Sequence, residues 1–451
     1  MSTERPRQHF GMMSFTGSGH LNALIPLAQQ LKERGHRVTF FEKQKIEVRV
    51  RQAGLDFFPI GADRSSSIEH DPPLNDSSLR SQVSMLQFNL RRIMDDLNIY
   101  LEETPSALAR TGVDALLVNE IALTGPTVAQ IARLPYFIIS TSVPHSFGWN
   151  GFRRLSGYEY SASWFSAVET ALLEVSALRL RGPIRGMLDA HRQQLGLGSA
   201  REGRKAFPEL AHITQLPQCL DLPRSRLPAN FHYTGPFANQ AARPHVDFPW
   251  DRLDGRPIVY ASLGTTRNVQ AFVFRLVAEA CQHLNLQLVI SLGGRFDAGV
   301  LPDLPGSPLV TKFAPQLEIL KLATLVITHG GPNTVFETLM EGTPMVAIPL
   351  AHDQPAVAAR LARLGIAEVL PVMRLSANKI LRAVTKVLND PNYRRAAMKM
   401  RATLQSLHGA VRAADVIEEA LHKHASTPRP DSVTHHSFEA ACVGTPSSIA
   451  Q

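Results

Sequence analysis

Cysteine is scarce in this chain, which holds only Cys219, Cys281 and Cys442 among its 451 residues. An odd number of widely separated cysteines fits neither a disulfide framework nor a thiolate metal site. No apolar run approaches the roughly 20 residues that a membrane-spanning helix requires, and the polar amino-terminal segment lacks the pattern of a signal peptide. These absences predict a soluble, cytoplasmic protein.

Charge of one sign is likewise not concentrated in any block. The net charge is +8, but the lysines and arginines are scattered, and the aromatic residues, 7% of the chain, are not interleaved with them. A surface for single-stranded nucleic acid requires both features, so we expect no nucleic-acid partner. The positive charge permits at most a loose association with an anionic membrane surface. The sequence leaves the oligomeric state open.

Strand and helix signals alternate along the chain. An apolar strand over 9–15 and a glycine turn over 16–20 precede a helix over 21–35 and a strand over 36–42. Such a βαβ unit predicts a doubly wound parallel sheet. The same alternation restarts near residue 256, and 451 residues exceed one ordinary hydrophobic core. We therefore expect an α/β protein with two Rossmann-like domains facing a cleft.

The domain boundaries follow from shifts in composition. The predicted units are an N-terminal domain at 1–235, a linker at 236–253, a C-terminal domain at 254–405, a helix at 406–425 and a disordered tail at 426–451. The tail is rich in Ser, Thr and Pro, a composition that cannot bury enough apolar surface to fold. In doubly wound folds, ligands bind at the carboxyl ends of the strands, so the functional residues are sought there.

Residues 325–342 read LVITHGGPNTVFETLMEG, a buried strand that ends on His329 and runs into a helix. Glycines at 330 and 331 let the backbone approach a ligand closely, and a proline at 332 suits a first helical turn. Asn333 and Thr334 add side-chain donors beside the free N–H groups of the helix start. This combination predicts a phosphate site. The alternative is ordinary capping of a βα turn.

Two further segments carry groups that suit a nucleotide sugar. Asp353 and Gln354 follow the next strand, where a carboxylate beside an amide can bind vicinal sugar hydroxyls or cap the helix. Phe313 and Gln316 lie on a loop, where they can stack on a base and contact a ribose.

Together these segments resemble the donor-binding signature of family 1 glycosyltransferases, a group that includes plant UDP-dependent and bacterial carotenoid and macrolide glycosyltransferases. The matches are aromatic-Ala-Pro-Gln at 313–316, His-x-Gly-x-Asn-Thr-x-x-Glu at 329–337, Gly-x-Pro at 342–344 and Asp-Gln at 353–354. The resemblance extends over nearly the whole chain and is nearest to bacterial zeaxanthin glucosyltransferase-like members. It implies the two-domain GT-B fold, with an acceptor-binding first domain, and inverting transfer from a nucleotide sugar.

The resemblance also assigns roles to donor-binding residues. It implies that Phe313 stacks on uracil, that Gln316 and Glu337 hold the ribose, and that Asp353 and Gln354 hold the sugar. The residues implied at the diphosphate are Thr265, His329, Gly331, Asn333 and Thr334. The start of the helix at 331–334 would stabilise the charge of the leaving diphosphate, so we expect no metal cofactor.

His20, at the end of the first glycine turn, matches the catalytic histidine of the family. An alcohol is a poor nucleophile near neutral pH, and an imidazole that takes its proton is typically worth ~10²–10⁴-fold in rate. The family supplies an aspartate to orient this histidine, whereas this chain has Asn119 followed by Glu120. Three interpretations follow: a weakened His–Asn pair, replacement of the aspartate by Glu120, or an acceptor acidic enough to need little help.

The leading hypothesis is therefore an inverting UDP-glycosyltransferase that moves a hexose, with glucose favoured, onto a hydroxyl of an apolar terpenoid, carotenoid or polyketide acceptor. Aromatic residues between 147 and 165 suggest an apolar acceptor pocket, with Phe147 and Trp149 as candidates. One alternative is a non-catalytic nucleotide-sugar-binding partner protein, and another is a transferase that uses a dTDP-sugar. A Rossmann oxidoreductase is disfavoured because the third glycine of a dinucleotide-binding loop is missing.

Overall fold

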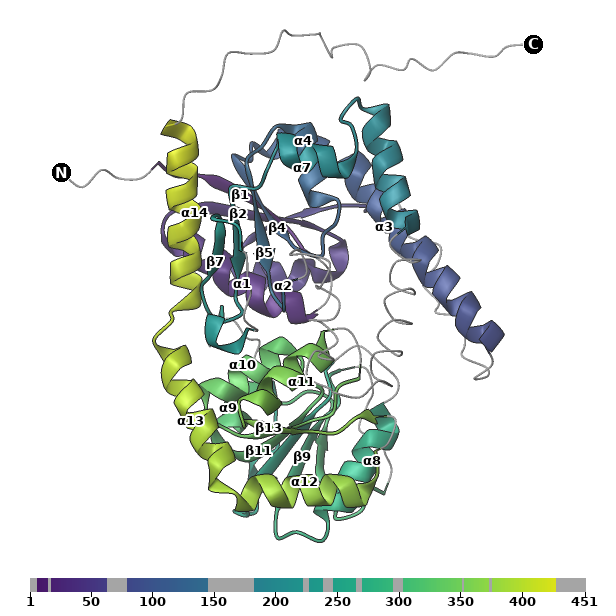
Figure 1. Cartoon of the computed structure of the whole chain (residues 1–451), viewed down its shortest axis with the longest axis vertical. Coiled ribbons are helices and arrows are strands. Elements are labelled where there is room, and N and C mark those ends of the chain that lie inside the picture. The colour runs from purple at the N-terminus through teal and green to yellow at the C-terminus, as the bar shows by residue number, and fades with distance from the viewer. Residues whose placement is uncertain are drawn as a thin grey trace, which may run out of the picture.

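The structure is a computed structural model that describes residues 6–14, 18–62, 79–144, 182–221, 227–237, 246–264, 270–294, 303–350, 353–372 and 375–426. Within these residues the chain forms two parallel sheets with helices on their faces, one domain above the other in Figure 1. The predicted α/β class with two doubly wound domains is confirmed. No helix in these ranges is both long and apolar enough to span a bilayer. The tail after residue 426 lies outside the described residues.

The first sheet has seven parallel strands in the order β3-β2-β1-β4-β5-β6-β7. Its strands are β1 (His9–Met13), β2 (Arg37–Glu42), β3 (Asp56–Pro59), β4 (Ala115–Asn119), β5 (Tyr136–Ser140), β6 (Ala211–Thr214) and β7 (Phe231–Tyr233). Its helices include α1 (Ser18–Glu33), α2 (Glu47–Gln52), α3 (Leu79–Thr111), α4 (Gly125–Ala132) and α7 (Ala200–Ala206), and residues 182–194 are also helical. The strand order reverses between β1 and β4, so the carboxyl ends of these two strands mark the usual ligand position.

The second sheet has six parallel strands in the order β10-β9-β8-β11-β12-β13. Its strands are β8 (Ile258–Ser262), β9 (Gln287–Ser291), β10 (Leu309–Thr311), β11 (Ala323–Thr328), β12 (Met345–Ala347) and β13 (Ala367–Val369). Its helices are α8 (Gln270–Cys281), α9 (Gln316–Leu322), α10 (Pro332–Met340), α11 (Gln354–Arg363), α12 (Ala377–Asn389) and α13 (Pro391–Gln405). The predicted linker at 236–253 falls between β7 of the first sheet and β8 of the second.

Both faces of the first sheet are buried, which explains why its central strands read as continuous apolar runs. Successive side chains of a strand point to opposite faces. Leu117 and Ile139 pack in a hydrophobic cluster with residues of α1, whereas Leu116 and Ile138 pack in another with residues of α3 and α4. The alternation of side chains along β4 and β5 therefore decides on which face of the sheet each residue at the ends of these strands lies.

Helix α1 begins at Ser18, three residues earlier than the sequence pattern predicts. The expected glycine turn over 16–20 is therefore wrong at its end, because His20 lies in the first turn of the helix. Polar and glycine residues are tolerated there, since the first N–H groups of a helix have no intrahelical partner.

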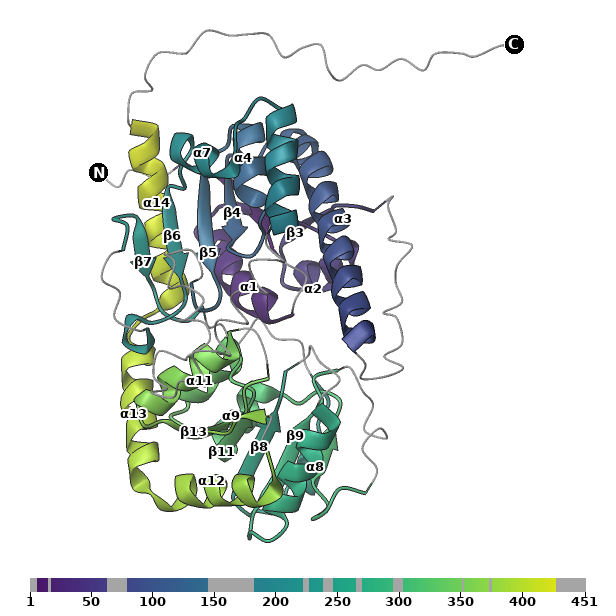
Figure 2. The ribbon, with the colours of Figure 1, turned by 45° about the vertical axis from the view of Figure 1, so that its right-hand side comes forward.

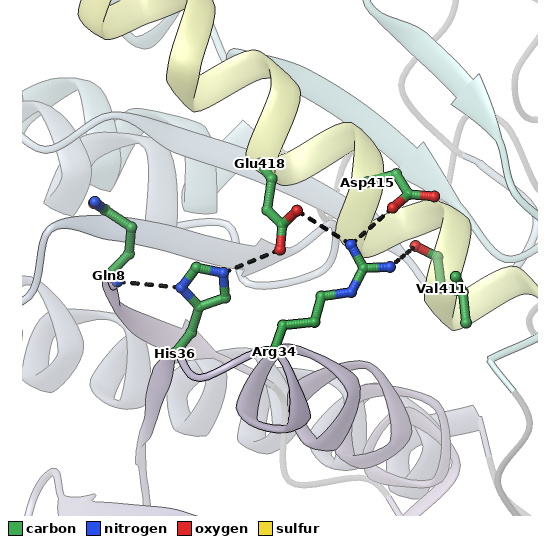
Figure 3. A network of polar contacts seen from close by, with 6 residues as sticks. All are labelled: Gln8, Arg34, His36, Val411, Asp415 and Glu418. Atoms are coloured by element: carbon green, nitrogen blue, oxygen red, sulfur yellow. Dashed lines mark hydrogen bonds and ion pairs between the residues drawn. The ribbon is translucent and has the colours of Figure 1, made fainter. Parts of the chain in front are cut away.

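The last helix, α14 (Gly409–Ser426), leaves the second domain and packs on the first sheet beside α1 (Figures 1 and 2). Arg34 binds both Asp415 (Nη1–Oδ1, 2.7 Å) and Glu418 (Nη1–Oε2, 3.1 Å), as Figure 3 shows. The backbone N–H of Gln8 donates to His36 Nδ1 at 3.1 Å. Nε2 of a neutral His36 must then carry the proton that reaches Glu418 Oε1 at 3.1 Å. This network fastens α14 to the first domain.

The two domains also share an apolar cluster. Val143, Leu216 and Leu220 of the first domain pack with Phe336 and Val357 of the second. Burial of these side chains at a common interface fixes the position of one domain against the other.

A buried ion pair lies at the same interface. Arg360 Nη2 is 3.1 Å from Asp221 Oδ1, and the two side chains are 3% and 1% exposed. The other carboxylate oxygen of Asp221 accepts a hydrogen bond from the Tyr233 hydroxyl at 2.7 Å. Charges buried this deeply persist only when each has its partners, so the pair requires the observed domain arrangement.

Replacing Glu418 by glutamine tests the attachment of α14. An amide can accept from only one of Arg34 and His36 and turns its NH₂ group toward the other donor. We expect the free energy of unfolding to fall by about 1–3 kcal/mol, the cost of an unsatisfied buried group, measured by urea unfolding. The matched control is Glu419→Gln, because Glu419 pairs with Lys423 on the exposed side of the helix. Equal stability of the two variants would contradict this account.

Candidate active site

The candidate active site is formed where the carboxyl ends of the two sheets approach each other. α1 follows β1 and carries His20, and the neighbouring strand β4 ends on Asn119. In the second domain β11 leads to His329, beside the end of its neighbour β8. α1 lies directly above α10 in Figure 1, and Asn333 Nδ2 donates a hydrogen bond to the carbonyl of Gly19.

His20 is held by a residue that the sequence pattern does not single out. Its Nδ1 lies 2.6 Å from the hydroxyl of Thr141, and the Nδ2 of Asn119 lies 3.2 Å from the same oxygen. Asn119 and Thr141 are 1% and 5% exposed. The register places Asn119 opposite Ile139, two residues before Thr141, so the two side chains point to one face. Thr141 could have been found by asking which residue extends the strand beside Asn119.

Glu120 lies on the other face of the sheet. Its Oε2 accepts a hydrogen bond from Ser140 Oγ at 2.5 Å, and its Oε1 is 4.0 Å from His212 Nε2. Glu120 and Ser140 alternate with Asn119 and Thr141, so they point toward the face covered by α3 and α4. The geometry therefore places Thr141, rather than Glu120, next to Nδ1 of His20.

His329 lies in a slot between two glycines. A Cβ added to Gly264 or Gly331 would come within 2.6 or 2.4 Å of His329 Nε2. Burial lowers the pKa of His329 to about 4, against the opposing effects of Asp353 and the backbone of Ser262. The imidazole is therefore neutral near pH 7 and can donate one N–H to an anion.

Helix α10 starts beside this imidazole. Gly331 is its N-cap and Pro332 its first residue, and no side chain caps the free N–H groups. Asn333 and Thr334 lie in the first turn as predicted. Asn333 Oδ1 accepts from Gln215 Nε2 at 3.1 Å, so this side chain contacts the first domain through both of its amide atoms. The uncapped start of α10 is a site of positive potential that suits phosphate.

The residues predicted at the base and ribose form one group. Phe313 is 50% exposed, with its ring against Gly294, where an added Cβ would come within 1.8 Å. Gln316 Nε2 donates to Glu337 Oε2 at 2.5 Å, and the hydroxyl of Tyr260 donates to Gln316 Oε1 at 3.1 Å. A half-exposed ring suits a nucleoside base because it offers a stacking face, and the Gln316–Glu337 pair, whose first member lies three positions along the chain from Phe313, offers acceptors for ribose hydroxyls.

Asp353 and Gln354 differ in their surroundings. Asp353 accepts a hydrogen bond from Ser142 of the first domain. Gln354 is 6% exposed, and its Oε1 accepts from the backbone N–H of Leu350 at 2.8 Å. Of the two, the Asp353 carboxylate lies at the junction between the domains.

Comparison with known proteins agrees with this arrangement. Residues 208–410 match the family model described as UDP-glucoronosyl and UDP-glucosyl transferase. The zeaxanthin glucosyltransferase of Pantoea ananas is 28% identical over 419 residues, which cover 92% of this chain and 96% of that protein. The demethyllactenocin mycarosyltransferase of Streptomyces fradiae is 27% identical, over 92% of this chain and 86% of that one.

Among solved structures, the glycotransferase of kitacinnamycin superposes with a TM-score of 0.70 at 24% identity, covering 92% of this chain and 99% of that one. The structural comparison and the sequence comparison both point to glycosyltransferases. The chain has the GT-B fold and is similar over most of its length to glycosyltransferases. The resemblance to family 1 glycosyltransferases is confirmed.

Three predicted site residues lie outside the described residues: Thr265, Phe147 and Trp149. Across the ranges that the structure describes, no group of three or more His, Cys, Asp or Glu side chains is placed to hold a metal ion.

Gly331→Ala tests the slot around His329. The φ of Gly331 is −63°, which any residue adopts, so the effect is steric alone: the new methyl displaces the imidazole. We expect UDP to bind about 10-fold more weakly, from ~1–3 kcal/mol of overpacking, as measured by isothermal titration calorimetry. Gly186→Ala is the control, because a Cβ there meets nothing within 4 Å. Unchanged UDP affinity in Gly331→Ala would show that His329 can move at no cost to binding.

Proposed function

We propose that the glycosyltransferase moves a hexose, glucose first among candidates, from a UDP-sugar to a hydroxyl of an apolar natural product, with inversion and with His20 as general base. The observation that carries the proposal is the contact between the two helix starts. Asn333 in the first turn of α10 hydrogen-bonds the carbonyl of Gly19, the residue before His20. The proposed base and the turn proposed to bind phosphate are therefore neighbours across the domain junction.

In the proposed reaction, Nε2 of His20 takes the proton of the acceptor hydroxyl as that oxygen attacks the anomeric carbon. The bond from this carbon to the diphosphate oxygen breaks, and the diphosphate leaves with the electron pair. Attack from the face opposite the leaving group inverts the anomeric centre. The neutral imidazole of His329 and the N–H groups of α10 would donate to the leaving oxygens, where charge develops.

The donor end of the site supports a nucleoside diphosphate sugar. Phe313 offers a half-exposed face to a base, and the Gln316–Glu337 pair offers acceptors to a ribose. The match to a family model named for UDP-sugar transferases favours UDP. A dTDP-sugar remains the alternative, because stacking does not separate the two pyrimidines.

The relatives support an apolar natural product as acceptor, since one is named for zeaxanthin and another for demethyllactenocin. We propose a terpenoid, carotenoid or polyketide carrying a free hydroxyl. The acceptor would lie over the first domain, next to His20.

The reaction is proposed to need no metal cofactor, because the start of α10 and the His329 N–H supply the donors for the leaving diphosphate. We expect an excess of EDTA to leave the rate of UDP release unchanged. Loss of the rate on chelation and its recovery with added Mg²⁺ would overturn this part of the proposal.

His20→Ala tests the transferase itself. We expect kcat to fall by ~10²–10⁴-fold, the contribution of a positioned base, while UDP affinity stays unchanged. The assay follows UDP release and product mass with UDP-glucose, dTDP-glucose and a panel of hydroxylated carotenoids, terpenoids, polyketides and phenolics. UDP binding with no product from any pair would favour the non-catalytic nucleotide-sugar-binding protein.

A further inference from the structure

We propose that Thr141 is the positioning residue for His20 and that, with Asn119, it takes the place of the carboxylate that would otherwise orient the base. The inference rests on the proposed function of His20. It starts from one observation: the Thr141 hydroxyl lies within hydrogen-bond distance of both His20 Nδ1, at 2.6 Å, and Asn119 Nδ2, at 3.2 Å.

The orientation of the Asn119 amide is determined by the backbone. Its Oδ1 accepts the N–H of Ile121 at 3.1 Å, so the NH₂ group must point toward Thr141. An NH₂ group can only donate. The Thr141 oxygen is therefore an acceptor in this contact, and one of its two lone pairs is used.

The second lone pair of Thr141 can accept from His20 Nδ1–H. In that tautomer Nε2 carries the lone pair that takes the acceptor proton. If the Thr141 hydroxyl instead donated to Nδ1, then Nε2 would carry hydrogen and could not act as a base.

The arrangement also fits the protonated base. An imidazolium donates from both nitrogens, and the Thr141 oxygen can accept from His20 and Asn119 together. The contact keeps the ring in place through the proton transfer but supplies no full negative charge. It therefore gives position, and less charge stabilisation than an aspartate would.

Thr141 is itself held firmly. It is 5% exposed, and its carbonyl accepts a hydrogen bond from Gln215 Nε2 at 2.5 Å. The same Gln215 donates to Asn333 in the donor-binding turn of α10. The residue next to the base and the residue next to the phosphate site thus share one amide, which couples the two halves of the site.

The test compares Thr141→Val with Thr141→Ser in the active enzyme. Valine has the shape of threonine but no hydroxyl, so we expect kcat to fall about 10–100-fold, part of the ~10²–10⁴-fold that a positioned base supplies. KM for the donor and UDP affinity should not change. Serine keeps the hydroxyl and should restore most of the rate. Thr104→Val is the control, because Thr104 is fully buried and its hydroxyl has no hydrogen-bond partner.

A double-mutant cycle separates positioning from general damage. In the His20→Ala background, Thr141→Val should have no further effect on kcat, because Thr141 acts through His20. Asn119→Asp should raise kcat when Thr141 is present and should lose this gain in the Thr141→Val background.

The outcomes distinguish the two proposals. If His20→Ala abolishes product but Thr141→Val equals the wild type, the transferase stands and Thr141 is not the positioning residue. A Thr141→Ser variant as impaired as Thr141→Val would also overturn the inference, since it would indicate a packing role for the methyl group. If His20→Ala retains full activity, the proposed function of His20 fails, and the role of Thr141 with it.

Discussion

Parallel strand pairing is the constraint on which the site depends. It brings all carboxyl ends of a sheet to one edge, and reversal of the strand order opens a place for a ligand between two of them. This happens twice here, at β1 and β4 in the first domain and at β8 and β11 in the second. Because the two edges face each other, the Asn333 amide reaches the Gly19 carbonyl although the two residues are more than three hundred positions apart.

The two strand edges face each other only if the domains keep one relative position. Three contacts of different kinds serve this: the shared apolar cluster, the buried Arg360–Asp221 pair, and α14, which starts beside the second domain and is fastened to Arg34 and His36 of the first. Burial of apolar side chains supplies most of the free energy that holds the two domains together. Each ion pair, in contrast, forms only in one particular alignment of its two partners. The polar contacts across the site, such as Gln215 with Asn333, can then form at hydrogen-bond distance.

The groups that line this junction are mostly neutral donors and acceptors. His329 is held neutral by burial, Asn119 presents an amide to Thr141, and Gln215 links the two halves with another amide. An anionic ligand therefore meets N–H donors and the positive end of α10. In the same way, the Thr141 hydroxyl rather than a negatively charged group lies beside His20.

The sequence by itself determined the α/β class, the βαβ alternation and the glycine turn that leads into a helix at 329–334, because these depend on local patterns of apolar spacing, glycine and helix starts. It also predicted roles for His20 and Asn119. It did not identify Thr141, and it left Glu120 as an equal candidate. Only the tertiary structure decided between them, because alternation along β4 and β5 sends Asn119 and Thr141 to the face that α1 covers and Glu120 to the opposite one. Which face carries α1 depends on how distant segments pack, and no local pattern contains that information.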